Sequence, residues 1–427
     1  MISSTISSRP VQTLPRSRSG LRARLAPVQV PRAPVRAAVA ELIFRAGVAR
    51  MPIRVELPDG QRWGAGGPGD PLMQIARPAD LFRRLGRDAN IGLGEAYQAG
   101  DWSSPQLADL LTVLATQLTT VVSPGVQGLR GWAQRMREHL ESNTTLVARR
   151  NVESHYDLSN EMFASFLDES MTYSCAWFDS DDRCDRDDGN DGLTRAQLRK
   201  IDGVLDYAGV CAGSTVIEIG TGWGELAIRA ARRGATVTSL TLSREQKQLA
   251  EQRVREAGVD DRVTIVLQDY RDAVGQYDAV VSVEMIEAVG ADYWPTYFTV
   301  LDALVKPGGR IALQSITMAN DRMQISRRTY SWINKYIFPG GLIPSIEAIE
   351  STIAEHTSLR ISGRRDFGPD YALTLQCWRR RFLANWHTVE ADGFDDTFKR
   401  TWEYYLAYCE AGFRAGYIGV TQLQLSR

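Results

Sequence analysis

The sequence predicts an α/β protein: a Rossmann-like sheet with helices on both faces, joined to a small N-terminal domain that is mixed α/β or helical. From residue 214 onward, short apolar runs alternate with helix-compatible segments, and a glycine-rich turn follows the first run. Such alternation indicates crossover connections, which give a parallel sheet covered on both faces. The length of 427 residues exceeds one ordinary compact domain, so a second domain is expected.

The expected strands and helices of the sheet follow in order along the chain. Residues 216–219 (Val-Ile-Glu-Ile) form a short buried strand, and a helix runs from the glycine turn to Arg233. Residues 243–257 are expected to form the next helix, and residues 306–309 (Lys-Pro-Gly-Gly) a tight turn before the last strand. The other strands are expected at residues 236–242, 263–267, 279–283 and 310–315.

The N-terminal part has a different composition. Residues 1–36 are rich in Ser, Arg and Pro and lack acidic residues, so a disordered basic tail is expected. An organelle transit peptide and electrostatic attraction to anionic lipid are the alternatives. Residues 37–145 are expected to form the N-terminal domain, with a role in lipid binding or oligomerisation.

Composition excludes several classes of protein. The chain is 44% hydrophobic and 24% charged, which is typical of a globular protein. No apolar run approaches the roughly 18 residues of a membrane-spanning helix, which argues against an integral membrane protein. The net charge of -1 argues against a nucleic-acid binder. The five cysteines form no CxxC pair, which favours a reduced, cytosolic compartment, and no His spacing indicates a metal site.

The turn Gly220-Thr-Gly222-Trp-Gly224 follows the first strand and opens a helix. Ligands of open parallel sheets bind beyond the carboxyl ends of the strands, and glycine lets them approach the backbone. The second strand ends without an acidic residue, which makes a dinucleotide such as NAD the poorer interpretation. A tight turn without a ligand is the structural alternative.

Several segments then resemble the cyclopropane-fatty-acyl-phospholipid synthase family of S-adenosylmethionine-dependent methyltransferases, which includes tuberculostearic-acid-type fatty acyl methyltransferases. The resemblance implies a class I methyltransferase domain over residues 146–427, with a substrate-binding insertion at about 320–345. The segments that carry it are His155-Tyr-Asp-Leu-Ser-Asn160, Met171-Thr-Tyr-Ser-Cys-Ala176, residues 218–225, residues 240–246, Ser282-Val-Glu-Met-Ile-Glu-Ala-Val-Gly290, residues 334–341 and Gly412-Phe-Arg414.

The resemblance implies an S-adenosylmethionine site. The methionine end of the cofactor is expected to contact Tyr173 and Ser174, and the glycine turn contributes Glu218, Gly220, Gly222, Trp223 and Gly224. The adenosine is expected to contact Thr241 and Gln246, and the adenine lies near Asp269 and Tyr270. For Gln246 and Tyr270, ordinary surface positions are the alternative.

Family members transfer the sulfonium methyl group to a cis double bond of a phospholipid acyl chain. The site must align the alkene and shelter a carbocation, which aromatic faces stabilise. Tyr173 and Tyr371 fall on family motif positions. Other aromatic residues of this region, for which core packing is the alternative, are Trp177, Tyr293, Trp294, Tyr336 and Phe338.

The resemblance also implies a bound bicarbonate that accepts a proton, held by residues matching Cys175, Glu287, Ile316 and Tyr371. Glu287 is the preferred catalytic residue, and a carboxylate at a helix start is its alternative. Cys409 matches a family cysteine and is either reactive or a buried structural thiol. His155 lines the cofactor entrance or caps a helix.

Two departures from the family pattern concern the product. The resemblance implies histidines where this chain has Ala288 and Gln314. Their loss leaves two products open: a cyclopropane ring, or a methylene branch that a separate reductase converts to a 10-methyl group.

The aromatic segment 330–344 is expected to form part of an acyl-chain tunnel, with core packing as its alternative. The protein is expected to be cytoplasmic and peripheral at the inner face of the membrane, with a homodimer as a further expectation. A methyltransferase acting on a small soluble acceptor, and a lipid-binding scaffold without catalysis, are the competing functions.

Overall fold

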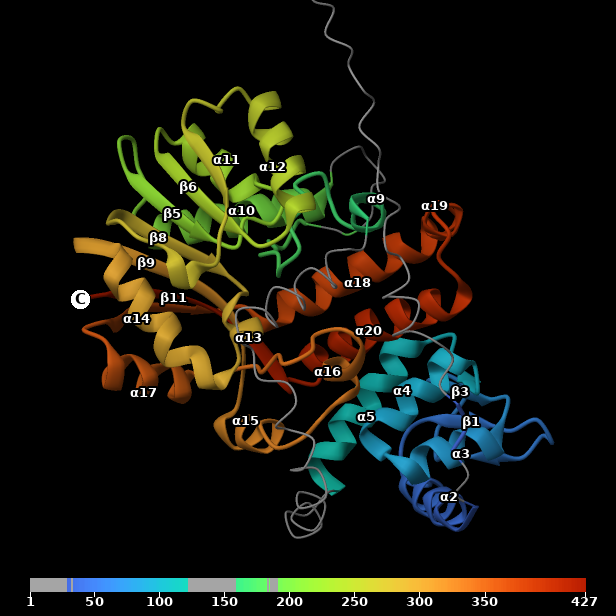
Figure 1. The fold of residues 1–427 in the computed structure, drawn as a ribbon. Coiled ribbons are helices and arrows are strands. Elements are labelled where there is room, and N and C mark those ends of the chain that lie inside the picture. The colour runs from blue at the N-terminus through green and yellow to red at the C-terminus, as the bar shows by residue number, and fades with distance from the viewer. Residues whose placement is uncertain (1–28, 32–33, 122–158, 183, 185–190) are drawn as a thin grey trace, which may run out of the picture.

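A computed structural model describes residues 29–31, 34–121, 159–182, 184 and 191–427. Its central sheet has seven strands in the order β10-β11-β9-β8-β5-β6-β7 (Figure 1). Strands β5 to β9 are parallel, and β11 is antiparallel to both β9 and β10. The strands are β5 (Thr215–Ile219), β6 (Thr236–Thr241), β7 (Val263–Leu267), β8 (Tyr277–Val283), β9 (Val305–Met318), β10 (Arg360–Asp366) and β11 (Ile418–Ser426).

The predicted parallel sheet is confirmed, with two differences. Residues 306–309, expected as a separate turn, lie inside β9, where Gly308 has φ 80° and the pairing with β8 shifts register. The glycines therefore make a local irregularity in a long strand. The sequence prediction also omitted β10 and β11. Strand β10 is polar and lies at the sheet edge, so it lacks the apolar run by which the other strands were recognised.

Alternating strand residues face two separate hydrophobic cores. Val216 and Val281 point to the face covered by α10 (Gly192–Tyr207), α11 (Glu225–Arg232) and α12 (Arg244–Glu256). Ile217 and Val280 point to the opposite face, covered by α14 (Trp294–Leu304) and α17 (Ile346–His356). Full burial of each such side chain contributes about 1.5–3 kcal/mol. This two-sided burial fixes the strand register and therefore the positions of the strand ends.

The N-terminal part is mixed α/β, one of the two expected forms. Its small sheet has the order β2-β1-β3-β4, and α2 begins at Pro34, inside the segment expected as a tail. None of the described helices is both long enough and apolar enough to cross a bilayer. The elements are α2 (Pro34–Val48), β1 (Arg54–Glu56), β2 (Arg62–Trp63), β3 (Leu72–Ile75), α3 (Pro78–Arg87), α4 (Ala89–Ala99), β4 (Trp102–Ser103) and α5 (Leu107–Val121).

This N-terminal part shares a hydrophobic core with the C-terminal helices. Helices α4 and α5 pack on α20 (Asp396–Arg414), as Figure 1 shows. Trp332 of α16 (Trp332–Tyr336) is fully buried and donates to Gln98 at 3.0 Å. This part of segment 330–344 therefore forms core packing. The remaining helices are α9 (Asn160–Ala164), η2 (Tyr270–Asp272), α13 (Ile286–Val289), η3 (Ala291–Tyr293), α15 (Asn320–Ser326), α18 (Gly368–Ala384) and α19 (Trp386–Ala391).

One pair of cysteines is bonded. Cys184 and Cys377 form a disulfide with their Cα atoms 5.3 Å apart, although 193 residues separate them in sequence. The expectation of an entirely reduced set of thiols is therefore wrong for this pair. No sequence spacing indicates such a distant partner. The bond ties the segment before α10 to α18.

The contact between α4 and α16 gives a test of the shared core. A Cβ at Gly94 would lie 2.5 Å from Cδ1 of the buried Trp332. We expect Gly94→Ala to lower the free energy of unfolding by about 1–3 kcal/mol, because the indole has no room to move. Gly47→Ala, at a helical position with no atom within 4 Å, should instead raise it by about 0.5–1 kcal/mol. Denaturant unfolding measures both, and equal effects of the two variants would contradict this packing.

Candidate active site

The glycine turn lies between β5 and α11, at the carboxyl edge of the parallel strands. Gly220 has φ 100°, and a Cβ there would lie 2.8 Å from the side chain of Met285. Gly222 has φ 53°, and a Cβ there would meet no protein atom within 4 Å. The turn is therefore closed on the Met285 side and open at Gly222. An open backbone at the start of a helix suits the close approach of a ligand.

The residues expected at the adenosine lie after the next two strands. The Thr241 hydroxyl donates to Oε1 of Gln246 at 2.8 Å, and both side chains are buried. Burial alone would raise the pKa of Asp269, but hydrogen bonds from Arg271 outweigh this effect and lower the pKa. Burial raises the pKa of Tyr270 to about 12, so this phenol stays neutral. The surface alternative for Gln246 is thereby removed, since Gln246 is buried.

Aromatic side chains connect the turn to the segment around Tyr173. The Trp223 indole donates to Asn160 at 2.8 Å and packs on Phe163 with ring centroids 5.0 Å apart. Phe163 also contacts Tyr173, at 5.3 Å. The hydroxyls of Tyr173 and Tyr405 are hydrogen-bonded at 2.7 Å. Trp223, Phe163, Tyr173 and Tyr405 therefore form one continuous set of aromatic side chains.

A cluster of buried polar side chains follows Tyr173 in the structure: Lys200 with Ser174, and Glu218 with Ser239. The Lys200 ammonium, 1% exposed, donates to the Ser174 hydroxyl at 2.5 Å. Glu218 accepts from the Ser239 hydroxyl at 2.5 Å, and burial raises the pKa of Glu218 to about 8. Burial also lowers the pKa of Lys200 to about 8. Ser174 and Glu218 thus have hydrogen-bond partners within the chain, and their contact with a cofactor stays a prediction.

The centre of the site is a carboxylate that the sequence prediction did not select. Glu284 follows β8 directly, and its Oε1 accepts from the Cys175 backbone N–H at 2.9 Å and from Gln314 at 2.8 Å. Its Oε2 accepts from the Tyr371 hydroxyl at 2.6 Å. Cys175 and Gln314 are fully buried and Tyr371 nearly so, whereas Glu284 is partly exposed. Three residues from distant parts of the chain therefore converge on one carboxylate.

The backbone of Glu284 is strained. Its φ of 52° lies in the left-handed region, which disfavours residues with a Cβ by about 1–3 kcal/mol. The sequence held one signal for it: an acidic residue at the carboxyl end of a parallel strand, where ligands bind.

Glu287 forms a second, separate carboxyl site. Its Oε1 accepts from the Ile316 backbone N–H at 2.5 Å and from the Ser315 hydroxyl at 2.9 Å. Its buried Oε2 has no hydrogen-bond partner among the residues that the structure describes. Burial and the neighbouring Glu284 charge raise the pKa of Glu287 to about 8. Glu287 therefore carries a proton at neutral pH, next to Glu284.

These contacts do not fit the expected bicarbonate. The resemblance assigned Cys175, Ile316, Tyr371 and Glu287 to that anion. Instead, Cys175 and Tyr371 donate to Glu284, and Ile316 donates to Glu287. The donors already have carboxylate partners within the chain, and a further anion would lie against Glu284.

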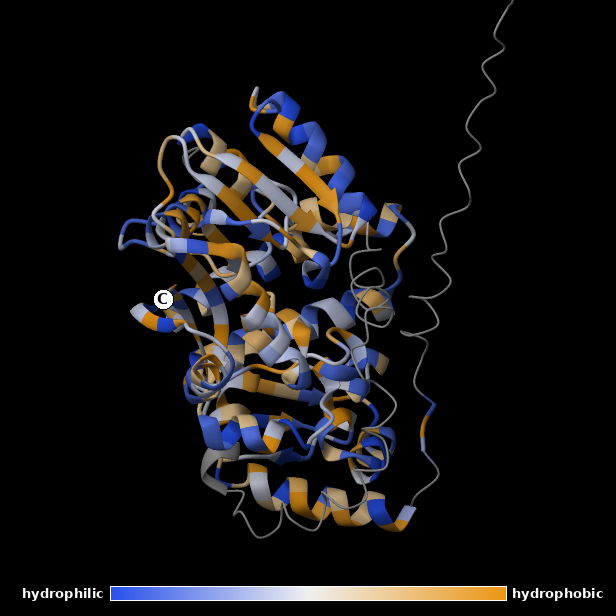
Figure 2. Cartoon of the chain, turned by 60° about the vertical axis from the view of Figure 1, so that its left-hand side comes forward, coloured by the Kyte–Doolittle hydropathy of each residue, from blue (hydrophilic) through white to orange (hydrophobic). Residues whose placement is uncertain are grey.

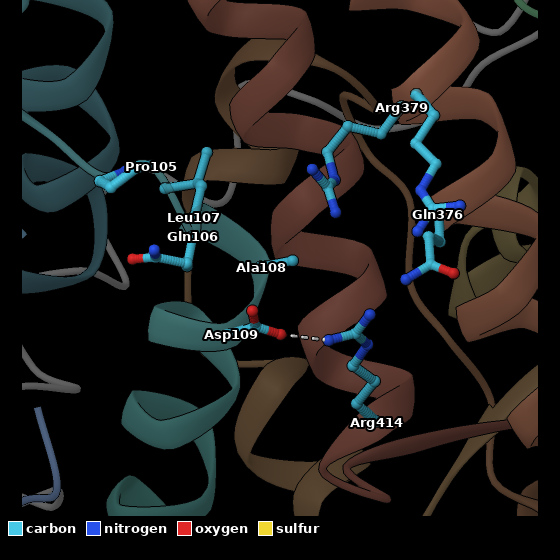
Figure 3. Close-up of a pocket in the computed structure, with 9 residues that line it drawn as sticks. Pro105, Gln106, Leu107, Ala108, Asp109, Gln376, Arg379 and Arg414 are labelled. Atoms are coloured by element: carbon cyan, nitrogen blue, oxygen red, sulfur yellow. Dashed lines mark hydrogen bonds and ion pairs between the residues drawn. The ribbon is translucent and has the colours of Figure 1, made fainter. Parts of the chain in front are cut away.

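Two further predictions concern Cys409 and His155. Burial raises the pKa of Cys409 to about 12, so its thiol is protonated, and a catalytic role for it stays a prediction without a supporting contact. His155 lies outside the described residues. A surface hollow of about 250 Å³, shown in Figure 3, contains none of the predicted site residues, and its Arg414 donates to Asp109 at 2.6 Å.

Comparison with known proteins decides the family. The family model described as mycolic acid cyclopropane synthetase matches residues 143–423. The chain belongs to this family. It is 51% identical over 402 residues to the tuberculostearic acid methyltransferase UfaA1 of Mycobacterium tuberculosis, covering 93% of this chain and 94% of that one. It is 34% identical over 401 residues to the cyclopropane-fatty-acyl-phospholipid synthase of Escherichia coli, covering 91% and 92%.

Solved structures of the mycolic acid cyclopropane synthetase family support the same assignment. The cyclopropane synthase MmaA2 from Mycobacterium tuberculosis matches with a TM-score of 0.58 and 30% identity, over 67% of this chain and 99% of that one. The mycolic acid cyclopropane synthase CmaA1, solved in complex with SAH and CTAB, matches with a TM-score of 0.58 and 29% identity, over 68% and 100%.

As a member of the mycolic acid cyclopropane synthetase family, the protein is an S-adenosylmethionine-dependent methyltransferase. The residues present fit that cofactor, because the turn is open at Gly222 and a buried polar pair, Thr241 and Gln246, follows the next strand. Tyr173 and Ser174 would contact the methionine end, and Gly220, Gly222 and Trp223 would line the turn. Thr241 and Gln246 would face the adenosine, with Asp269 and Tyr270 near the adenine. When bound, it supplies an electrophilic methyl group.

The proton on Glu287 gives a pH test. We expect kcat to be level near pH 7 and to fall as the pH rises through about 8, because loss of the Glu287 proton places a second negative charge beside Glu284. Glu287→Gln cannot lose this proton, so its profile should lack the alkaline fall. Steady-state kinetics from pH 6 to 9.5 make the comparison. A fall that persists in Glu287→Gln would contradict this assignment and point to Lys200, whose pKa is also about 8.

Proposed function

We propose that this protein transfers a methyl group to the cis double bond of an unsaturated phospholipid acyl chain and releases a methylene-branched chain. The observation that carries the proposal is the carboxyl pair Glu284 and Glu287 at the carboxyl edge of the sheet, where Gln314 donates to Glu284. Gln314 and Ala288 stand at positions where the resemblance implies histidines. The 51% identity to a tuberculostearic acid methyltransferase favours a branched over a cyclic product.

The side chains around Glu284 suit a cationic intermediate on the lipid. The ring of Tyr371 packs on Phe413 at 4.5 Å, and Tyr173 packs on Trp378 at 5.2 Å between ring centroids. Aromatic faces attract a cation and exclude water, which would otherwise trap it as an alcohol. A carbocation formed here is also close to an anionic carboxylate, which stabilises it further.

Gln314 influences which proton leaves. Its Oε1 accepts from Gln422 at 3.0 Å, and this orientation directs its amide N–H to Glu284. An amide does not titrate, so Gln314 holds Glu284 without exchanging protons with it. Ala288 supplies no polar side chain at all. The proton acceptor is thus a fixed group, and a hydride shift can precede proton loss.

Lipid analysis tests the product. In a host rich in oleoyl phospholipid and fed labelled methionine, expression should give acyl chains that carry one labelled methylene carbon. Fragmentation of these chains locates the added carbon, which distinguishes a branch from a ring of equal mass. A ring across the former double bond would contradict the branched product. Absence of labelled lipid would contradict the lipid substrate and favour the soluble-acceptor alternative.

The route to the membrane is proposed from α2. Val35, Val39, Leu42 and Ile43 repeat at helical spacing and are 52–77% exposed, which forms an apolar stripe on α2, the lowest helix in Figure 2. The same helix carries Arg36 and Arg45. An apolar stripe with adjacent basic residues suits reversible contact with an anionic lipid surface. We therefore propose that α2 contacts the membrane surface during catalysis, and that this surface is the cytoplasmic face.

Vesicle binding tests this stripe. Leu42→Glu should weaken binding to vesicles of anionic phospholipid about tenfold or more, because it places a charge in the apolar stripe. Val274→Glu is the matched control, since Val274 is 80% exposed but lies outside α2. Co-sedimentation measures both variants. Equal binding by the two would exclude α2 as the lipid-contacting element.

A methylene branch is an alkene, so a separate reductase is needed to give a saturated methyl branch. That reductase, and a homodimer formed through residues 37–145, are part of the proposal.

A further inference from the structure

We propose that the Glu284 carboxylate is the proton acceptor of the reaction and occupies the position of the anion that the resemblance implied. The inference rests on the proposed function. It adds a catalytic residue and removes the requirement for a bicarbonate ion.

The contacts of Glu284 are those of a fixed base. Both carboxylate oxygens accept hydrogen bonds, from the Cys175 backbone, the Gln314 amide and the Tyr371 hydroxyl, at 2.6–2.9 Å. These three donors come from the segment before α10, from β9 and from α18. Donors arranged around one carboxylate orient it and restrict its motion, as a general base requires.

The position of Glu284 is maintained against its own backbone preference. A φ of 52° is a conformation that glycine adopts readily and glutamate does not. Such strain persists only where the surroundings hold the residue in place, and it is concentrated at functional sites. Replacement by glycine relieves the strain and removes the carboxylate in one step, which makes Glu284→Gly an informative variant.

Glu284 and Glu287 together carry one proton and one negative charge. Burial raises the pKa of Glu284, but the hydrogen bond from Tyr371 and the Lys200 charge oppose this rise. Glu287 receives fewer donors and faces the charge of Glu284. Two neighbouring carboxyls share one proton more easily than they carry two charges. Glu284, whose two oxygens both accept hydrogen bonds, is arranged to hold the charge, and Glu287, whose Oε2 has no donor among the described residues, is arranged to keep the proton.

The proposed step balances as follows. The alkene electron pair forms a bond to the methyl carbon while the bond from that carbon to the donor sulfur breaks and leaves its electron pair on sulfur. The positive charge then lies on the adjacent chain carbon. A hydride shifts from the methylated carbon to that neighbour, so the charge moves to the methylated carbon. A C–H bond of the new methyl group then breaks, its electron pair forms the C=C bond of the methylene branch, and its proton binds Glu284. Glu284 returns this proton to solvent after product release.

The test compares Glu284→Gly, Glu284→Gln and the surface control Glu350→Gln in full-length protein, in buffer freed of carbon dioxide. We expect the wild type and Glu350→Gln to be equally active without bicarbonate, and both Glu284 variants to lose about 100-fold or more in kcat. Added sodium formate or bicarbonate should restore Glu284→Gly at least tenfold, because glycine leaves the three donors free for a small anion. It should not restore Glu284→Gln, whose amide fills the space.

Binding of S-adenosylhomocysteine, measured by calorimetry, and the melting temperature show that each variant is folded. A wild type that needs bicarbonate, a Glu284→Gln variant with near wild-type kcat, or a Glu284→Gly variant that no anion restores would each overturn the inference. A wild type that methylates no unsaturated lipid under any of these conditions would instead overturn the proposed function.

Discussion

The partly exposed carboxylate of Glu284 is the constraint on which the rest of the active site depends. A carboxylate surrounded by protein is stable only when donors satisfy it, and here three distant parts of the chain each supply one. The positions of Cys175, Gln314 and Tyr371 are therefore set relative to one another by a common acceptor. Removal of any one donor would leave this carboxylate with fewer hydrogen bonds and loosen the other two donors.

The surrounding polar groups extend this arrangement. Gln422 on β11 donates to Gln314 on the neighbouring strand β9 and orients it, so the antiparallel strand β11 also contributes to the site. Lys200 on α10 donates to Ser174 and also moderates the charges of Glu284 and Glu218. Hydrogen-bonded chains of this kind hold a site in one geometry because each member depends on its neighbours.

The sequence allowed the parallel strands to be predicted because each is an apolar run covered on both faces. It also indicated the ligand edge, through Gly220, Gly222 and Gly224. Glu284 was not predicted, since nothing local shows that Gln314 and Tyr371 come near it; only the pairing of β8 with β9 places Gln314 beside the strand end. The disulfide between Cys184 and Cys377 escaped prediction for the same reason, because it joins distant parts of the chain. Strand β10 escaped prediction because it is polar and has no apolar run.

Helix α20 contacts both the N-terminal part and the active site. One side of it receives α4 and α5, while its Tyr405 is hydrogen-bonded to Tyr173 in the active site. A substitution that shifts α20 would therefore change both its packing on the N-terminal part and the position of the Tyr173 hydroxyl.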